Sequence, residues 1–212
     1  MSDTHHPHKP TYLTPRQIKE SCHILNPDAP EEERLCTISE EFRQGFNVME
    51  KRTEYRKSVT FFGSARLDPK NKYWDDAYRL AKRIGEELGY AIVTGGASGI
   101  MEAANHGAFD AHVPSLGMSI VLPTEQKSNK YVSDDVPFNF FFSRKVLLAF
   151  SAEAYIFFPG GYGTLDEFTG ILTLVQTKKI PPVPIILYGV EFWTPLVTFF
   201  KETLIKEYKT VA

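Results

Sequence analysis

A short stretch combines glycines, a threonine and two carboxylates, and it reads Pro159-Gly160-Gly161-Tyr162-Gly163-Thr164-Leu165-Asp166-Glu167. Glycines let the backbone approach a ligand closely, and the free N–H groups at a helix start point toward an anion. We therefore expect a phosphate site at 160–164, where the hydroxyl of Thr164 adds a donor. The carboxylate of Glu167 would repel a phosphate, so its presence indicates chemistry on a group attached to that phosphate.

The residues around this stretch indicate a strand, a turn and a helix start. The apolar run 154–158 before it predicts a buried strand, and apolar residues at helical spacing follow it from Phe168 to Val175. A simpler interpretation stays open, in which the glycines form a tight turn. Asp166 and Glu167 would then only complement the dipole of the first helical turn.

The wider pattern alternates strands and helices, which is typical of a parallel sheet. We expect an α/β fold, a Rossmann-like doubly wound sheet with helices on both faces. The pattern predicts strands over 59–62, 90–93, 115–122, 154–158 and 183–187, and helices over 71–88, 99–111, 144–150, from the motif to about 177, and 191–206. Ser143 is the expected N-cap of the helix over 144–150, and 123–142 reads as a polar loop and an aromatic segment.

The N-terminal part of the chain looks different from this core. We expect a flexible arm over 1–30, a helical extension over 31–56 and a catalytic domain over 57–212. The arm is rich in proline and histidine. The extension places its apolar residues on one stripe, expected to pack on the main domain or on a partner subunit: Leu35, Ile38, Phe42, Phe46 and Met49.

Composition excludes several function classes. A net charge of -2 gives no electrostatic case for binding nucleic acid or an anionic membrane. No apolar run approaches the ~20 residues of a membrane span, and the polar N-terminus has no signal peptide, so we expect a cytoplasmic protein. Cys22 and Cys36 have no metal-ligand spacing and are expected to be free thiols.

A second glycine-rich turn follows the predicted strand over 90–93. It runs from Thr94 to Asn105 and contains Gly95, Gly96 and Gly99. The spacing matches a dinucleotide fingerprint only loosely, the acidic residue expected after the next strand is missing, and no Walker lysine follows the glycines. We therefore expect neither NAD nor ATP, and no cofactor or metal.

Three motifs together resemble the LONELY GUY family, the cytokinin riboside 5'-monophosphate phosphoribohydrolases. The stretch 159–167 resembles the PGGxGTxxE signature of that family. The pair Arg144-Lys145 and the glycine turn 94–105 also occur in the order typical of the family. The resemblance covers roughly 57–188.

The resemblance implies a hydrolase that cleaves a nucleoside 5'-monophosphate into free base and ribose 5-phosphate. It implies that Arg144 and Glu167 are catalytic, and that family members form homodimers. Together with the two glycine turns, it implies a set of substrate-contacting residues: Gly95, Gly96, Gly99, Glu125, Lys145, Gly160, Gly161, Tyr162, Gly163, Thr164, Asp166 and Thr173.

The residues before the arginine differ from those of shorter family members. This chain has Phe141-Phe142-Ser143 where those members carry Met-His-x, and with the helical extension it resembles the longer bacterial branch. An aromatic pocket wall stacks on many bases without reading their edges. The sequence therefore leaves open whether a cytokinin precursor or a general nucleoside monophosphate is the substrate.

Two other functions compete with hydrolysis. Molybdenum-cofactor carrier proteins resemble this fold, so the chain is alternatively a carrier that binds a phosphorylated ligand without turnover. Members of the family also carry a lysine decarboxylase label, which would require a lysine that forms a Schiff base with pyridoxal phosphate. Lys145 is the lysine near the motif, and the arginine before it does not suit that role.

Overall fold

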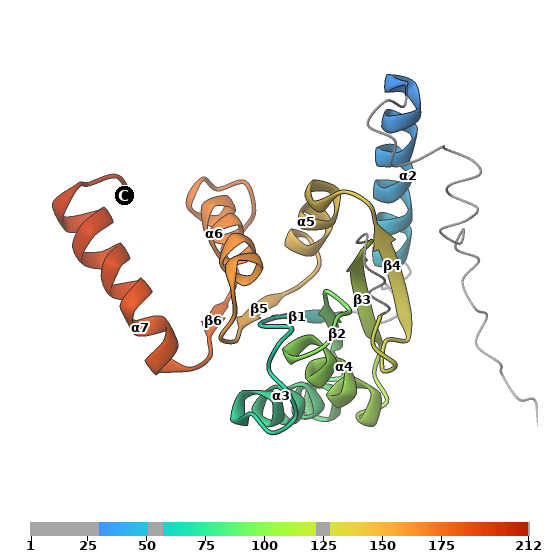
Figure 1. The fold of residues 1–212 in the computed structure, drawn as a ribbon, viewed down its shortest axis with the longest axis horizontal. Helices are drawn as coiled ribbons and strands as arrows, with labels where there is room; N and C mark the ends of the chain where they lie inside the picture. The colour runs from blue at the N-terminus through green and yellow to red at the C-terminus, as the bar shows by residue number, and fades with distance from the viewer. Residues whose placement is uncertain (1–29, 51–56, 122–127, 212) are drawn as a thin grey trace, which may run out of the picture.

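The computed structural model describes residues 30–50, 57–121 and 128–211. Figure 1 shows a sheet with helices above and below it. The elements in chain order are α2 (Glu31–Glu50), β1 (Ser58–Phe62), α3 (Lys72–Leu88), β2 (Ala91–Thr94), α4 (Ile100–Asp110), β3 (Ser115–Ile120), β4 (Asp134–Phe138), α5 (Phe141–Ala149), β5 (Ala154–Phe157), α6 (Tyr162–Gln176), β6 (Ile185–Leu187), α7 (Val190–Phe199) and the π-helical segment η2 (Phe200–Glu207).

The sheet is parallel throughout, with strand order β4-β3-β2-β1-β5-β6. The predicted Rossmann-like fold is therefore confirmed. From β1 the chain first adds strands toward β4 and then returns to add β5 and β6 on the other side. In such sheets, ligands bind where this reversal occurs, beyond the carboxyl ends of the central strands.

Two apolar layers hold the helices on the sheet. Helices α3 and α4 cover one face, and α2, α5, α6 and α7 stand on the other (Figure 1). The first layer packs side chains such as Phe61 and Ile100 between the sheet and α4. The second packs Phe157, Phe168 and Trp193 between the sheet, α6 and α7.

Clear capping signals made some helices easy to predict. The side chain of Asn71 accepts a hydrogen bond from the backbone N–H of Tyr73 at the start of α3, and Gly89 ends the helix in the left-handed conformation. In the described part of the chain, no helix is both long and apolar enough to cross a bilayer.

Strand β4 was not predicted, because 123–137 was expected to be a polar loop. Residues 134–138 instead pair with β3 in parallel register. Two aspartates and Pro137 are unusual in a strand, but proline is tolerated on edge strands, and β4 is an edge of this sheet. The sheet consequently has a further strand beyond β3, and Asp135 lies on that strand.

The prediction for the buried face of α2 was right in part. Phe42 and Met49 pack against the core of the main domain, whereas Leu35 and Phe46 are 57% and 43% exposed. The most buried residues of the helix are partly polar and consist of Thr37, Glu41, Gln44 and Val48. Apolar contacts and the hydrogen bonds of Glu41 together thus hold this helix on α5 and β4.

Glu41 links α2 to the start of α5. Its carboxylate accepts hydrogen bonds from the backbone N–H of Asn139 at 2.5 Å, from the side-chain amide of Asn139 at 3.0 Å and from the hydroxyl of Ser143. The expectation that Ser143 caps a helix starting at Arg144 was wrong. The helix begins at Phe141, and the carboxylate of Glu41 lies at its positive end, where a negative charge is favourable.

Helix α6 also begins earlier than expected, at Tyr162. Asp166 and Glu167 therefore lie beyond the first turn, and the expectation that Glu167 sits in that turn was wrong. The simpler interpretation, in which both carboxylates serve only the helix dipole, loses its support because that effect fades within the first turn.

We predict that Glu41→Ala destabilises the folded protein by about 1–3 kcal/mol, because the donors at the start of α5 lose their buried acceptor. Urea unfolding of the variant and the parent protein measures this difference. Glu32→Gln, an exposed change on the same helix, is the matched control. Equal unfolding midpoints for all three proteins would contradict the role of Glu41.

Candidate active site

A cavity of about 660 Å³ lies at the carboxyl ends of the central strands. This volume falls within the range of small-molecule sites, about 300–1,000 Å³. Four segments line it: the turn 63–66 after β1, the turn 95–97 after β2, the end of β3, and the start of α6 at 161–164. Arg144 of α5 and Glu167 of α6 complete the wall, so the structure brings both predicted catalytic residues to one cavity.

Glu167 is the most unusual group in this cavity. The residue is 7% exposed, and its Oε2 atom is buried without a hydrogen-bond partner among the described residues. Burial raises the pKa of this carboxyl above its ordinary value, while the charges of Lys145 and Arg144 oppose that shift. A carboxyl with a raised pKa is suited to exchange protons near neutral pH.

Arg144 is held from the side of β3. Its Nε atom donates to the backbone carbonyl of Met118 at 2.7 Å, which fixes the guanidinium over the end of that strand. Burial lowers the pKa of Arg144, and the negative charge of Glu167 opposes this shift. A guanidinium remains charged at any physiological pH. The cavity therefore holds a fixed cation near a carboxylate that is reluctant to ionise.

The guanidinium of Arg144 can occupy its position because residue 95 is a glycine. A Cβ atom added at this glycine would lie 2.2 Å from Nη2 of Arg144 and 2.9 Å from the sulfur of Met101. Any larger residue would displace the guanidinium. The second glycine turn thus makes room for Arg144 as well as contributing backbone to the cavity wall.

Hydrogen bonds fix the shape of this second turn. Thr94 accepts from the backbone N–H of Gly96 and donates to the buried side chain of Asn105. The side-chain amide of Asn129 donates to the carbonyls of Gly96 and Ala97 and to Asn105. Asn129 therefore holds its own segment of the chain against the glycine turn.

In the glycine turn at 160–164, neither packing nor backbone conformation requires a glycine at position 161 or 163. A Cβ atom at Gly161 or Gly163 would meet nothing within 4 Å, and neither residue has a positive φ. Gly160 differs, because a Cβ there would lie 2.1 Å from the hydroxyl oxygen of Thr164. Open space above Gly161 and Gly163 at a helix N-terminus is where an anion would approach the backbone.

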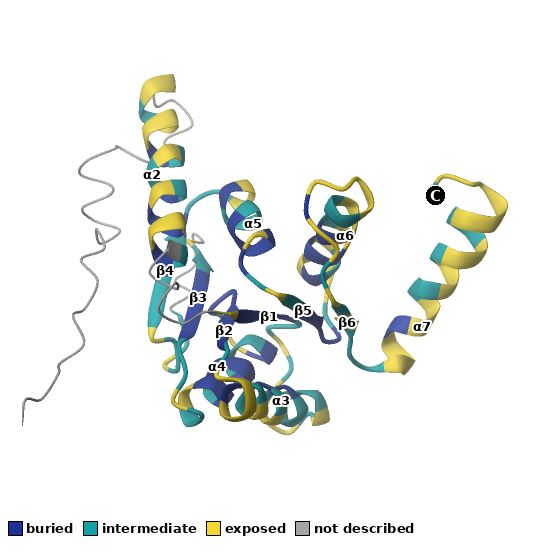
Figure 2. Cartoon of the chain, turned by 180° about the vertical axis from the view of Figure 1, so that it is seen from behind, coloured by how far each residue is buried: buried dark blue, intermediate teal, exposed yellow. Residues whose placement is uncertain are grey.

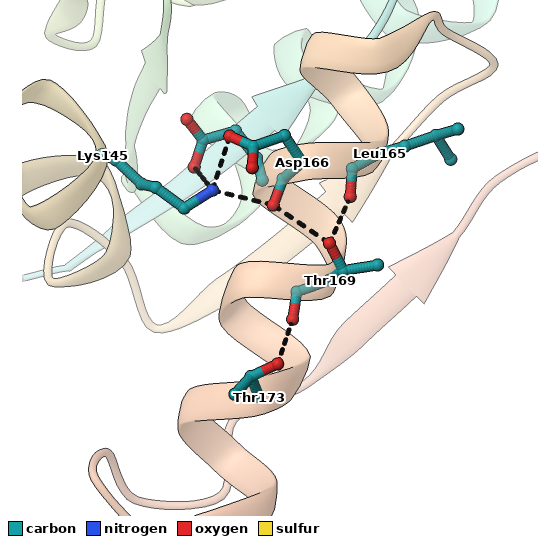
Figure 3. Close-up of polar contacts among 6 residues, drawn as sticks. Lys145, Leu165, Asp166, Thr169 and Thr173 are labelled. Atoms are coloured by element: carbon teal, nitrogen blue, oxygen red, sulfur yellow. Dashed lines mark hydrogen bonds and ion pairs between the residues drawn. The ribbon is translucent and has the colours of Figure 1, made fainter. Parts of the chain in front are cut away.

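Lys145, Asp166 and Thr173 lie apart from this cavity. They line a second cavity of about 390 Å³ between α5 and α6. Figure 3 shows Lys145 reaching from α5 to Asp166, where its Nζ atom donates to the carboxylate at 2.6 Å and to the backbone carbonyl at 2.8 Å. The hydroxyl of Thr173 donates to the carbonyl of Thr169 along the same helix. Lys145 does approach Glu167, at 3.8 Å from Oε2.

Three other predicted site residues also lie off the cavity wall or outside the described residues. Gly160 does not line the cavity, although Gly161, which follows it, does. Gly99 starts α4 with φ +70° beside the backbone of Ser64 and does not line the cavity. Glu125 and the histidines of the N-terminal arm lie outside the described residues. Within those residues, no group of histidine, cysteine, aspartate or glutamate side chains is arranged to hold a metal.

Sequence reasoning missed part of the cavity wall. Arg66 follows β1, Ser119 ends β3, and Ser128 precedes the segment that holds the glycine turn. The first of these had a signal, since a strand that runs into Gly63-Ser64 belongs at the ligand edge of a parallel sheet. The two serines had none, because only the strand order brings them beside Gly96.

The chain is similar to known proteins in sequence and in fold. A family model described as "Possible lysine decarboxylase" matches residues 101–211. The rice (Oryza sativa subsp. japonica) protein cytokinin riboside 5'-monophosphate phosphoribohydrolase LOG is 32% identical over 153 residues, which is 71% of this chain and 62% of the rice protein. The Arabidopsis thaliana protein of the same description, LOG2, is 27% identical over 73% of each chain.

A solved structure with another function has a similar fold. The molybdenum cofactor binding protein of Rippkaea orientalis superposes with a TM-score of 0.52 and 25% identity, over 69% of this chain and 86% of that protein. Both enzymes and a cofactor-binding protein are thus similar to this chain.

We predict that Glu167→Gln stabilises the protein at pH 7. Ionising the buried carboxyl opposes folding at every pH above its raised folded-state pKa, and this cost disappears below the ordinary value of 4.5. The gain from the substitution should therefore shrink as the pH falls from the raised folded-state pKa toward 4.5, and it should be absent below that value. Urea unfolding at several pH values measures it.

The exposed Glu153→Gln is the matched control and is expected to be neutral for stability. A Glu167→Gln protein that is less stable than the parent at pH 7, or a gain independent of pH, would show that the carboxyl is not held in an unfavourable environment.

Proposed function

The chain belongs to the LONELY GUY family of nucleoside monophosphate phosphoribohydrolases, and from this premise we propose that it hydrolyses the N-glycosidic bond of a nucleoside 5'-monophosphate. The products are the free base and ribose 5-phosphate, and the substrate is AMP or a cytokinin riboside monophosphate. The observation that carries the proposal is the nearly buried carboxyl of Glu167, which lines the same cavity as Arg144 and whose Oε2 atom has no hydrogen-bond partner among the described residues.

In the proposed reaction, water attacks C1' of the ribose as the bond to the base breaks. The electron pair of that bond leaves with the base, and the sugar acquires oxocarbenium character. Glu167 stabilises this positive charge and takes the proton of the attacking water, as carboxylates do in other glycoside hydrolases. Arg144 offsets the negative charge that develops on the leaving base.

The turn at 161–164 holds the phosphate in this proposal. Open space above Gly161 and Gly163 lets phosphate oxygens reach the N–H groups at the start of α6, and Thr164 adds a hydroxyl. Fixing the phosphate positions the sugar between the two catalytic side chains, which lowers the entropic part of the barrier. Residues 57–212 are the proposed catalytic domain, with the N-terminal segment 1–30 as an arm and 31–56 as an extension.

The alternative function is that of a carrier which binds a phosphorylated ligand without turnover. The similarity to the molybdenum cofactor binding protein of Rippkaea orientalis favours this function. A carrier has no use for a buried carboxyl beside a phosphate, because the two negative charges repel. The position of Glu167 therefore favours hydrolysis.

The residues do not fit the cofactor that a lysine decarboxylase requires. The amine of Lys145 is engaged with Asp166 between α5 and α6, and it lines the second cavity rather than the one that Arg144 and the glycine turns line. We derive no step through pyridoxal phosphate.

The central prediction is that the purified protein releases adenine from AMP. Glu167→Gln keeps the shape of the side chain but cannot accept the proton, so turnover should fall roughly 10²- to 10⁴-fold. Chromatography of the products measures it. Glu153→Gln, an exposed change that lines neither cavity, is the matched control. Binding of AMP with no release of adenine by the parent protein would support the carrier instead.

We also propose a homodimer formed through α5 and α6. Phe142 and Phe150 are 50% and 55% exposed and share a face of α5 with Val146, which lines the second cavity. Figure 2 shows exposed residues along both helices on the side away from the sheet.

A dimer through this face should dissociate when a charge is buried in it. Phe150→Glu is expected to give a monomer, whereas the parent protein and Leu88→Glu, an exposed change on α3 across the sheet, give dimers. Light scattering after size-exclusion chromatography measures the mass. A monomeric parent protein would rule the dimer out.

A further inference from the structure

A carboxylate behind the cavity wall determines which hydrogen bonds the far end of the cavity offers. The side chain of Asp135, on the unpredicted strand β4, accepts a hydrogen bond at Oδ2 from the hydroxyl of Ser128 at 2.7 Å. Ser128 and Ser119 both line the cavity, whereas Asp135 lies behind them. Burial raises the pKa of Asp135, and hydrogen bonding from Ser128 and Ser119 opposes this shift.

The carboxylate is shielded from solvent on its other side. Its Oδ1 atom is buried without a hydrogen-bond partner among the described residues. Gly117 and Val132 cover it, since a Cβ added at Gly117 would lie 3.1 Å from Oδ1 and 3.0 Å from a methyl carbon of Val132. With little water nearby, the charge of Asp135 depends on the neighbouring hydroxyl protons.

This arrangement sets the polarity of the serine that faces the cavity. A serine hydroxyl has a single proton, and an ionised carboxylate has only acceptors. Because Ser128 donates its proton to Asp135, it presents only lone pairs to a ligand. The ligand group that fits here is a hydrogen-bond donor.

The position of these residues matches the base of the proposed substrate. The phosphate turn follows β5, and Ser119 ends β3, with β1 and β2 between them. Three interstrand spacings separate the two places, about 14 Å. Arg144 and Glu167 line the same cavity, and Arg144 is anchored at β3. A nucleotide with its phosphate at α6 extends its base toward Ser119 and Ser128.

We propose that Asp135, acting through Ser128, makes the far end of the cavity accept hydrogen bonds and so selects bases that carry an amino group over bases with a carbonyl there. Asp135 is in this view a positioning residue that the base does not touch. The inference rests on the proposed function. It extends that function by assigning the selection of the base to Ser119 and Ser128. A secondary amine keeps one N–H, so an N6-substituted adenine also satisfies it.

AMP and inosine 5'-monophosphate test the proposal, because the amino group at C6 of AMP is a carbonyl in inosine 5'-monophosphate, where the neighbouring N1 also changes from an acceptor to an N–H donor. The parent protein should prefer AMP in kcat/KM by about tenfold or more, since a carbonyl would face acceptors only. In Asp135→Asn the amide can donate to Ser128, which frees the hydroxyl to donate to the ligand. The preference should then fall toward one or reverse.

Two further variants separate selection from stability. Ser128→Ala should lower kcat/KM for AMP about tenfold and leave that for inosine 5'-monophosphate nearly unchanged. Asp134→Asn, the neighbouring carboxylate on β4, contacts Ser133 and does not line the cavity, so it should keep the parental preference. A structural defect alone would lower both rates together and leave their ratio unchanged.

The outcomes distinguish this inference from the proposed function. Equal hydrolysis of both nucleotides by the parent protein, or a ratio unchanged in Asp135→Asn and Ser128→Ala, overturns the inference and leaves the hydrolase intact. If neither nucleotide is hydrolysed, the proposed function fails, and calorimetry of AMP and inosine 5'-monophosphate binding decides the inference. Tighter binding of AMP that is lost in Ser128→Ala supports it, and equal or absent binding of both overturns it.

Discussion

The candidate site depends on a carboxyl that is kept from water where the chain reverses its direction of winding. Glu167 is nearly buried, finds no hydrogen-bond partner for one oxygen within the described residues, and lies in a cavity with the fixed cation of Arg144. Neither side chain reaches this position alone. Arg144 needs the carbonyl of Met118 and the missing side chain of Gly95, and its helix needs the carboxylate of Glu41 at its start. Five parts of the chain thus converge on one buried carboxyl: α2, the turn after β2, β3, α5 and α6.

Elements with local signals were predictable from the sequence. Helix α3 has a capping asparagine and a terminal glycine, and the apolar runs of β1, β2 and β5 each end at a turn rich in glycine. Strand β4 was missed because its aspartates and proline resemble a loop, and only pairing with β3 makes it a strand. The face of α2 was predicted only in part for a similar reason, since the buried Glu41 pairs with residues about a hundred positions away.

The same distinction applies to the candidate site. The glycine turns, Arg144 and Glu167 could be named in advance because they lie in short motifs. Ser119, Ser128 and Asp135 belong to no motif, and the strand order alone brings them together at the cavity. Lys145 and Thr173 show the opposite case, since proximity in a motif placed them near the site although they line a neighbouring cavity.

The open space above Gly161 and Gly163 sets folding and ligand recognition against each other. Both positions accept a methyl group without a clash, and at Gly163, which lies within α6, alanine is a better helix former than glycine by up to about 1 kcal/mol. A laboratory selection for heat resistance alone would therefore fill this surface early. The selected proteins would be more thermostable, but their new side chains would block the place where a phosphate approaches the backbone. A selection for thermostable variants therefore has to include a screen for ligand binding.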